Sequence, residues 1–402
     1  MDILMLSDVY FPRVNGVSSS IRTFARVLTT MGHRVTLVAP DYGTDSGQDN
    51  YDREGFEVIR LPSRVIFFDP EDRLINAPAL REVLPKLAAR RWDVIHIHTP
   101  FRAHTLGVRL ARATARPTLE SYHTYFEQYI AHYLPWLPSP VLRFAARALS
   151  RRLCGGVDHL IVPSREIADV LKHYGIDTPS TLLPTGLDLG EFAGGDGARF
   201  RSQYGIAADR PVLVTVSRLA LEKNIAFLLQ VVKKLAKDIP DVLFVIAGEG
   251  PDAERLKKLS LSLGLHDNVR FFGNLDRRTS LLDCYRAGDA FVFASPTETQ
   301  GLVLIEAMAL GVPIVSTAVM GTATVLAGAR SAVVSDEDVD AFADHVAALL
   351  RDPPRRAALA AAGPQDARAW SVETLMQRAV TLYVDLADRD DPPMRAAPLQ
   401  AR

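Results

Sequence analysis

The sequence contains little cysteine, no long hydrophobic run and no excess of charge of either sign. Its two cysteines, Cys154 and Cys284, lie in stretches of helical pattern with no second thiol or histidine at metal spacing, so we expect inert thiols in a reducing compartment. No stretch approaches the roughly 18 consecutive apolar residues that a membrane-spanning helix needs. The formal net charge of -1 argues against a nucleic-acid-binding protein.

The chain also lacks a recognisable signal peptide. Met1 to Asp8 has an acidic second residue and only a short apolar run, and it resembles a first strand instead. With 48% hydrophobic and 23% charged residues, the composition is that of a soluble globular protein. We therefore predict a cytoplasmic protein whose membrane contact is peripheral, at the inner face.

Short β-branched runs alternate with stretches of 3.6-residue period twice along the 402 residues, which is typical of parallel sheets covered by helices. The expected strands are 3–6, 35–38, 58–61, 94–97, 118–122 and 159–162, then 212–216, 243–247, 269–272, 290–293 and 314–316. The fold class is therefore α/β, with two doubly wound, Rossmann-like domains. We place an N-terminal domain at 1–184, a turn-rich linker at 185–210, a C-terminal domain at 211–369, a helix at 370–387 that packs back on the first domain, and a disordered tail at 388–402.

Charged side chains follow a strand of the second domain, where open parallel sheets bind ligands. Ser295 to Leu302 leaves this strand and enters a helix, and Gly301 at the helix start would let a phosphate approach free backbone N–H groups. Glu298 in the loop and Glu306 in the helix could accept hydrogen bonds from two separate sets of sugar hydroxyls. Taken alone, this segment would fit equally well a non-functional interpretation, in which Glu298 is an ordinary glutamate at a helix start and Glu306 an ordinary glutamate on a helix surface.

A second strand end carries two cations. Ser217 to Asn224 contains Arg218 and Lys223, which together can neutralise a diphosphate and stabilise the charge that develops as it leaves. In the first domain, Gly16 follows the first strand, and its N–H could approach the same diphosphate from the opposite wall of a cleft. A single strand-end arginine is more often a solvated surface residue and a single glycine a plain turn, so the prediction rests on their combination.

These segments together resemble glycosyltransferase family four, which has the GT-B fold of two facing Rossmann-like domains with a cleft between them. The resemblance covers the chain to about residue 385 and is carried by Arg218 to Lys223, the Glu298 to Glu306 spacing, Ala247-Gly248-Glu249-Gly250-Pro251, Gly16 and Tyr122-His123-Thr124. It implies a retaining, metal-independent reaction without a cofactor, since the nucleotide sugar is a substrate.

The resemblance also implies roles for individual residues. Arg218, Lys223 and Gly16 would bind the donor diphosphate, and the backbone of Gln300, Gly301 and Leu302 would form a cradle for the donor. Glu298 would bind the donor sugar and Glu306 the ribose, and His123 would lie near the reacting sugar. His123, Arg218, Lys223 and Glu298 would be the catalytic residues. Many family members carry phenylalanine at the position of Gln300, so the resemblance implies the backbone cradle here and no side-chain contact.

A possible membrane face follows residue 124. The stretch 125–137 is dense in aromatic residues, and Arg143, Arg147, Arg151 and Arg152 follow it at helical spacing, a combination that anionic membranes attract. A core helix with a solvated basic face is the alternative. Residues 122–129 and 298–302 resemble the diacylglycerol glycosyltransferase branch of the family, which implies a membrane-lipid acceptor.

Three further motifs suggest other chemistry but fit it poorly. Gly248 to Ala253 matches a dinucleotide fingerprint, yet it does not follow a first strand, and Glu249 would place negative charge beside a pyrophosphate. His96 and His98 lack a third metal ligand nearby. Asp336-Glu337-Asp338 spells the D-x-D of metal-dependent transferases, but we expect it to begin a helix, where acidic residues favour the dipole.

The sequence therefore predicts transfer of a hexosyl or hexuronosyl group from a nucleotide sugar, a UDP-sugar by preference, to a hydroxyl of a lipid such as diacylglycerol. The partners are the donor, the lipid acceptor and an anionic membrane surface, with no nucleic acid. The alternatives are a nucleotide-sugar epimerase or hydrolase of the same fold, a transferase with a soluble acceptor, and a lipid-surface binding module without turnover.

Overall fold

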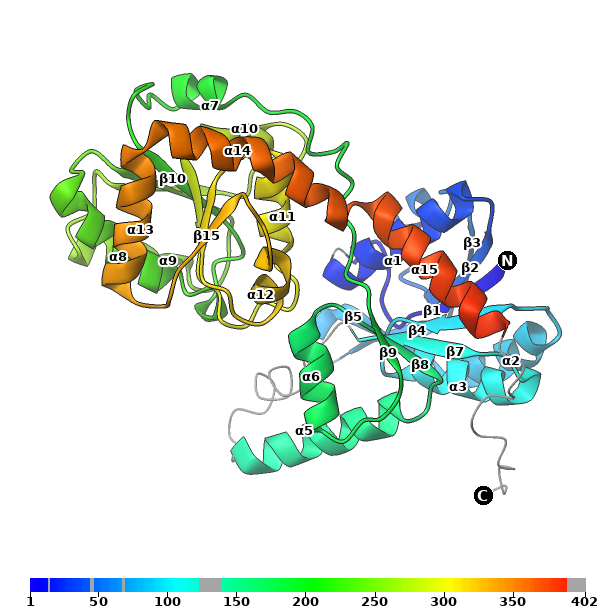
Figure 1. The fold of residues 1–402 in the computed structure, drawn as a ribbon. Helices are drawn as coiled ribbons and strands as arrows, with labels where there is room; N and C mark the ends of the chain where they lie inside the picture. The colour runs from blue at the N-terminus through cyan, green and yellow to red at the C-terminus, as the bar shows by residue number, and fades with distance from the viewer. Residues whose placement is uncertain (14, 44–46, 67–68, 123–138, 389–402) are drawn as a thin grey trace. The chain divides into compact units, whose positions relative to one another are not determined.

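The computed structural model describes residues 1–13, 15–43, 47–66, 69–122 and 139–388, and the chain divides into two compact units (Figure 1). The N-terminal unit comprises Met1–Gly186 and Leu375–Arg402, and the C-terminal unit comprises Leu187–Thr374. His123, the aromatic stretch 125–137 and residues 389–402 of the expected tail lie outside the described residues. Each unit is built around its own parallel sheet.

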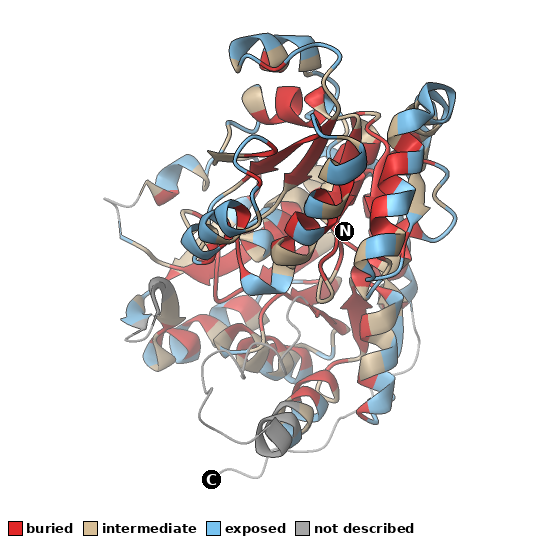
Figure 2. Ribbon diagram, turned by 90° about the vertical axis from the view of Figure 1, so that its left-hand side faces the viewer, coloured by how far each residue is buried: buried red, intermediate tan, exposed pale blue. Residues whose placement is uncertain are grey.

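The described strands of the N-terminal unit form a 7-stranded sheet in the order β3-β2-β1-β6-β7-β8-β9. Their bounds are β1 (Asp2–Leu6), β2 (Arg34–Pro40), β3 (Glu57–Leu61), β6 (Val94–Ile97), β7 (Thr118–Ser121), β8 (His159–Val162) and β9 (Ser180–Leu182). The central strands are buried along nearly their whole length, as parallel strands must be when helices cover both faces (Figure 2). An antiparallel pair, β4 (Ser63–Ile66) and β5 (Asp69–Ile75), follows β3 as a separate small sheet.

The helices of this unit begin where polar side chains satisfy their first N–H groups. Asn15 accepts a hydrogen bond from the N–H of Ser18 at the start of α1, and Ser164 caps α6 in the same way. The bounds are α1 (Gly16–Thr30), η2 (Gln48–Asn50), α2 (Ala77–Ala88), α3 (Arg102–Thr114), α5 (Ser139–Cys154), α6 (Arg165–His173) and α15 (Val372–Ala387). The C-terminal helix α15 is tied to this unit by a 2.7 Å hydrogen bond between Tyr383 and His96 of β6.

The C-terminal unit contains a 6-stranded parallel sheet in the order β12-β11-β10-β13-β14-β15, counted over the described strands. Their bounds are β10 (Val212–Val216), β11 (Leu243–Ala247), β12 (Val269–Gly273), β13 (Ala290–Phe293), β14 (Ile314–Ser316) and β15 (Ala332–Val334). The helices are α7 (Gly197–Gln203), η3 (Leu221–Lys223), α8 (Ile225–Asp238), α9 (Ala253–Ser262), α10 (Ser280–Ala287), α11 (Leu302–Ala309), α12 (Gly321–Leu326), α13 (Val339–Arg351), α14 (Pro353–Ala367) and η4 (Arg368–Trp370).

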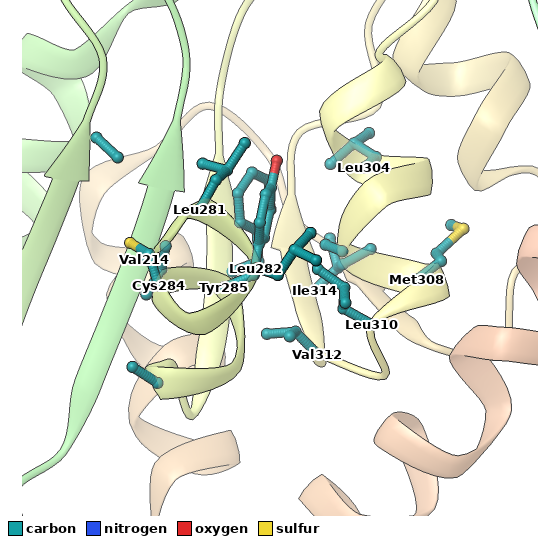
Figure 3. Packing of buried hydrophobic residues seen from close by; sticks show 14 of the residues in the cluster. Val214, Leu281, Leu282, Cys284, Tyr285, Leu304, Met308, Leu310, Val312 and Ile314 are labelled. Atoms are coloured by element: carbon teal, nitrogen blue, oxygen red, sulfur yellow. The ribbon is translucent and has the colours of Figure 1, made fainter. Parts of the chain in front are cut away.

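Alternate residues of the central strand β10 point into two separate hydrophobic cores. Val212 and Val214 join one core with α10 and α11, whereas Leu213 joins the other with α8 and α13. Figure 3 shows Tyr285 among other buried residues of the first core, which come from β10, α10, α11, β14 and the chain between α11 and β14. Buried hydrophobic side chains therefore cover both faces of this sheet.

The expected linker at 185–210 differs from the structure. From Leu187 onward it belongs to the C-terminal unit, it contains helix α7, and it buries Phe192, Phe200 and Ile206 in the core beside α10. Its glycines permit close packing as well as turning. A Cβ on Gly197, for example, would lie 2.2 Å from the carbonyl oxygen of Arg286.

Candidate active site

Strand order in the C-terminal unit reverses between β10 and β13. The chain runs from β10 outward through β11 and β12, then returns to β13 on the other side of β10. Ligands of open α/β sheets bind in the crevice outside the carboxyl ends of the strands at such a reversal. The loops after β10 and β13, which carry the residues singled out in the sequence, both begin at this point.

The loop after β10 is held down by its neighbour, the loop after β11. The N–H of Leu219 donates to the carbonyl of Glu249 at 2.8 Å, and a Cβ on Gly248 or Gly250 would lie 1.9 Å from the carbonyl oxygen of Ser217 or 2.3 Å from that of Leu219. The glycines of the fingerprint-like motif therefore permit loop packing. Arg218 is exposed on this loop, and its guanidinium makes no hydrogen bond or ion pair with any described residue.

Lys223 and Glu298 meet where the two loops come together. Nζ of Lys223 lies 2.5 Å from Oε2 of Glu298, and both side chains are about four-fifths buried, with 20% and 19% of their surface exposed. The hydroxyl of Ser295, directly after β13, donates to the carbonyl of Glu222 at 2.8 Å and joins the same loops. The cation and the carboxylate that the sequence analysis assigned to one donor site are thus in direct contact.

Gly301 turns the chain into α11. Its φ of +76° is a conformation that favours glycine, and Leu302 is the first residue of the helix. Gly321, after β14, donates its N–H to the carbonyl of Glu298 at 2.7 Å, and a Cβ at this position would lie 2.2 Å from the backbone of Thr299. The start of α11 is thus a backbone cradle supported by a third loop, and its free N–H groups favour an anion.

Glu306 lies in α11 with both carboxylate oxygens engaged. The Tyr285 hydroxyl donates to Oε2 at 2.7 Å, and the Arg277 guanidinium donates to Oε1 at 2.8 Å. Glu306 has only 3% of its surface exposed, whereas the side chain of Arg277 is 62% exposed and lies over the ring of Phe192. Burial, and then the adjacent Glu306, raise the pKa of Tyr285 well above its usual value, so the tyrosine stays a hydrogen-bond donor.

The N-terminal unit has its own reversal of strand order, between β1 and β6. Gly16 is the first residue of α1, and apart from its chain neighbours and the backbone of its own helix no described heavy atom lies within 4 Å of where its Cβ would be. Asp8, after β1, accepts hydrogen bonds from the hydroxyl of Thr99 at 2.8 Å and from the N–H groups of Arg102 and Ala103 at the start of α3. Burial raises the pKa of Asp8 to about 6, against the opposing effect of these donors.

Four of these positions were not identified from the sequence. Asp8, Arg277, Tyr285 and Gly321 act through partners distant in the chain; Tyr285, for example, reaches Glu306 across 21 residues. The positions carry no spacing motif that links them to the glutamates. Their partial signals are an acidic residue directly after the first strand for Asp8 and a glycine directly before a helix for Gly321.

The motifs that the sequence analysis set aside have structural roles here. His96 is satisfied by Tyr383 and by Ser121, whose hydroxyl lies 2.8 Å from Nε2. Asp338 accepts a hydrogen bond from the N–H of Ala341 and caps α13, as predicted. The described residues contain no group of three or more histidine, cysteine or acidic side chains that could hold a metal ion.

The arginines of the expected membrane face do not form one free stripe. The Arg147 guanidinium lies 5.2 Å from the ring centroid of Tyr174 in the α6 region, and Nε of Arg151 donates to the Tyr174 carbonyl. Arg152 is exposed, and Phe144 on the same helix is 74% exposed. The side chain of Arg143 lies outside the described part of the structure. Two of the four arginines therefore help to hold α5 against the end of α6.

Two family models match the chain, one for each half. The model described as Glycosyltransferase Family 4 matches residues 14–191, and the model described as Glycosyl transferases group 1 matches residues 196–366. The chain is 33% identical to the alpha-monoglucosyldiacylglycerol synthase of Streptococcus pneumoniae over 79% of this chain and 71% of the relative. It is 31% identical to the GDP-mannose-dependent alpha-(1-6)-phosphatidylinositol monomannoside mannosyltransferase of Mycolicibacterium smegmatis over 94% and 95% of the two chains.

Solved structures resemble the whole chain at lower identity. Anabaena Alr3699/HepE in complex with UDP superposes with a TM-score of 0.75 and 19% identity, covering 96% of this chain and all of the other. Sucrose-phosphate synthase from Thermosynechococcus elongatus has a TM-score of 0.73 and 22% identity, over 96% and 98%. Among the described residues, no helix combines the length and the apolar character that a bilayer crossing requires.

Proposed function

The chain belongs to glycosyltransferase family 4 and has the GT-B fold, and from that premise we propose that it transfers a sugar from a nucleotide donor to a lipid hydroxyl with retention of anomeric configuration. The observation that carries the proposal is the meeting of Lys223 and Glu298 beside the glycine-led start of α11. A diphosphate needs a cation and free N–H groups, and a sugar needs a carboxylate acceptor, so this one position offers all three.

Each residue has a distinct part in the proposed reaction. The bond between the anomeric carbon and the phosphate oxygen breaks, and the acceptor oxygen bonds to the same face of that carbon while its proton passes to the leaving diphosphate. Lys223 and Arg218 stabilise the charge that develops on the diphosphate, Glu298 accepts hydrogen bonds from the donor sugar, and Glu306 accepts them from the ribose. His123, outside the described residues, is proposed near the reacting sugar.

The proposed reaction is metal-independent. Lys223 and Arg218, whose guanidinium has no partner among the described residues, supply positive charge at the strand end where the diphosphate would lie, the role that a divalent cation has in other transferases. The proposal predicts that EDTA leaves turnover unchanged. Loss of activity in EDTA with rescue by manganese or magnesium would contradict it.

The donor is proposed to be a UDP-hexose or UDP-hexuronate and the acceptor a membrane lipid. The lipid acceptor is supported by relatives whose names include lipid substrates, and the UDP donor is supported by a structural neighbour bound to UDP. One relative uses GDP-mannose, so the base needs a direct test. Thermal shift with UDP, GDP and their sugars identifies the donor, because a ligand that binds only the folded state raises its stability.

Alanine substitution of the two cations tests the proposed site. Lys223→Ala and Arg218→Ala should each lower kcat/KM by more than about tenfold, since a charged partner of a transition-state anion contributes over about 1.4 kcal/mol. Lys233→Ala is a matched control, because Lys233 is an exposed lysine of α8 outside the site. Wild-type activity in both site variants would remove the proposed donor site.

Product analysis separates transfer from the alternatives. Labelled donor incubated with lipid extract should give labelled glycolipid and free nucleoside diphosphate in equal amounts. Free or isomerised sugar formed without acceptor would instead identify a hydrolase or an epimerase, and donor left unchanged would identify a binding module.

A further inference from the structure

A groove runs along α2 in the N-terminal unit, at the carboxyl end of the sheet. Its larger part has a volume of about 470 Å³ and lies between the chain after β3, the end of β5 and the starts of α2 and α3. A smaller part of about 280 Å³ shares Pro62, Ala79 and Glu82 with it and continues along α2 toward Arg90. All of its lining residues belong to the N-terminal unit.

Two arginines line the larger part, and neither has a neutralising partner among the described residues. The guanidinium groups of Arg64 and Arg102 form no hydrogen bond or ion pair with any described residue, although Arg102 donates its backbone N–H to Asp8. In the smaller part the arginines are neutralised, since Arg60 pairs with Asp52 and Arg90 with Glu57. The positive charge available to a ligand is thus concentrated at the end where α2 and α3 begin.

The other lining groups suit a hydroxylated phosphate. Asn76, the N-cap of α2, makes no capping bond with its side chain, so its side-chain amide is available to a ligand. The carboxylate of Glu82 forms no ion pair with a described residue and can accept hydrogen bonds from hydroxyls. Val65 and Phe101, next in sequence to the two arginines, are exposed by 52% and 53% and offer apolar contact.

From these features we propose that the groove binds the headgroup of a phosphate-bearing acceptor lipid. Arg64 and Arg102 hold the phosphate, for which the planar guanidinium is well shaped, and Glu82 and Asn76 hold the headgroup hydroxyls. Val65 and Phe101 contact the apolar part that follows. The inference rests on the proposed function and deepens it, because it selects anionic phospholipid headgroups over neutral acceptors such as diacylglycerol.

Direct binding tests the groove without turnover. Calorimetric titration with myo-inositol 1-phosphate and with sn-glycerol 3-phosphate should give a dissociation constant that rises more than about tenfold in the double variant Arg64→Gln/Arg102→Gln. The matched control is Arg81→Gln/Arg109→Gln, which removes the same charge from exposed positions of α2 and α3 outside the groove. Equal binding by both variants, no binding by the wild type, or inorganic phosphate binding as tightly as the headgroup phosphates would overturn the proposal.

An activity comparison connects the groove to transfer. Transfer is measured with vesicles of neutral lipid that contain either phosphatidylinositol or diacylglycerol. The double variant should raise KM for phosphatidylinositol more than about tenfold. Its KM for diacylglycerol and its dissociation constant for the nucleotide should both equal those of the wild type. If the wild type binds no nucleotide, the proposed function is wrong, whatever the titrations with the headgroup phosphates show. If it binds nucleotide and the double variant retains wild-type KM for phosphatidylinositol, the groove proposal alone fails.

Discussion

The orientation of Glu306, the proposed ribose acceptor, is set by its two hydrogen-bond partners. Its carboxylate is almost fully buried and is kept satisfied by one buried hydroxyl and one exposed guanidinium. Each carboxylate oxygen has a second lone pair, so the group can still accept from the two hydroxyls of a ribose. Tyr285 and Arg277 are therefore positioning residues for Glu306.

Tyr285→Phe should weaken nucleotide binding selectively. A hydrogen bond to a charged group contributes about 1.5–3 kcal/mol, and its loss leaves Glu306 less well oriented, so the dissociation constant for UDP or GDP should rise about tenfold. Binding of the 2′,3′-dideoxy nucleotide should change less than about twofold, because that ligand makes no ribose hydroxyl contact. Equal weakening of both ligands would mean that Tyr285 has only a structural role.

Gly16 offers a second test at residue scale. Because the space around its Cβ position is open and it begins α1, Gly16→Ala should leave stability unchanged or raise it by up to about 1 kcal/mol. If the backbone N–H here contacts the donor diphosphate, the added methyl group should lower kcat/KM by more than about tenfold. Activity assays and urea unfolding on one preparation distinguish the two effects.

Gly250→Ala is the contrasting variant for that test. Its Cβ would lie 2.3 Å from the carbonyl oxygen of Leu219, so it should lose stability and activity together. If Gly16→Ala is stable and fully active, Gly16 is an ordinary turn residue and not part of the donor site.

At the scale of secondary-structure elements, Asp8 connects β1, the chain after β6 and the start of α3. It follows β1, accepts from the chain after β6 through Thr99, and accepts from the first N–H groups of α3. A carboxylate at a helix start is favoured by the dipole, but complete burial disfavours its charge more, which is why its pKa lies near 6. The junction of β1, β6 and α3 is therefore sensitive to pH.

The sign of this effect follows from the raised pKa. Between 3.8 and about 6 the folded chain binds more protons at Asp8 than the unfolded chain, so this contribution to stability is fully present below the lower value and is lost as pH rises through 6. The free energy of unfolding of the wild type, minus that of Asp8→Asn, should fall by about 2.5 kcal/mol from pH 4 to pH 7. Urea titrations across this range measure it, and a constant difference between the two proteins would contradict the burial argument.

The elements also differ in how far the sequence predicts them. Continuous apolar runs located β1, β10 and β13 correctly, because a buried parallel strand needs apolar residues on both faces. β9 and β15 were missed because they are edge strands of three residues with partly exposed side chains. Helix α7 was missed because glycines that permit close packing look like linker residues in the sequence.

At the scale of the whole molecule, the sequence predicted some residues of the candidate site and missed others. Lys223 and Glu298 were predicted to share a site because both follow strands, and parallel topology brings strand ends to one edge. Tyr285 and Arg277 were not predicted, since only the packing of α10 beside α11 brings them to Glu306. The basic helix α5 was predicted, but the use of two of its arginines in packing was not.

The last prediction concerns association of the whole protein with membranes, which we propose occurs at the exposed surface of α5. Since Arg147 and Arg151 contact Tyr174, replacing them would disturb packing, so Phe144→Ser/Arg152→Gln is the more selective variant. A cation near an anionic bilayer contributes about 1 kcal/mol and an inserted aromatic ring adds apolar burial, so the variant should lower partitioning into anionic vesicles about tenfold or more.

Leu261→Ser/Lys258→Gln is the matched control for that variant, because it removes one exposed apolar side chain and one exposed cation from α9 of the other unit. After sedimentation with anionic vesicles, the control and the wild type should be found in the pellet and the α5 variant in the supernatant. Neutral vesicles should retain none of the three. Raising the salt concentration from 50 to 500 mM should weaken all the anionic binding, since exposed charges are screened over about 8 Å already at physiological ionic strength. If the two variants pellet equally, or if binding does not respond to salt, the basic face of α5 is solvated and does not bind membranes. A lipid acceptor would then have to reach the enzyme by another surface.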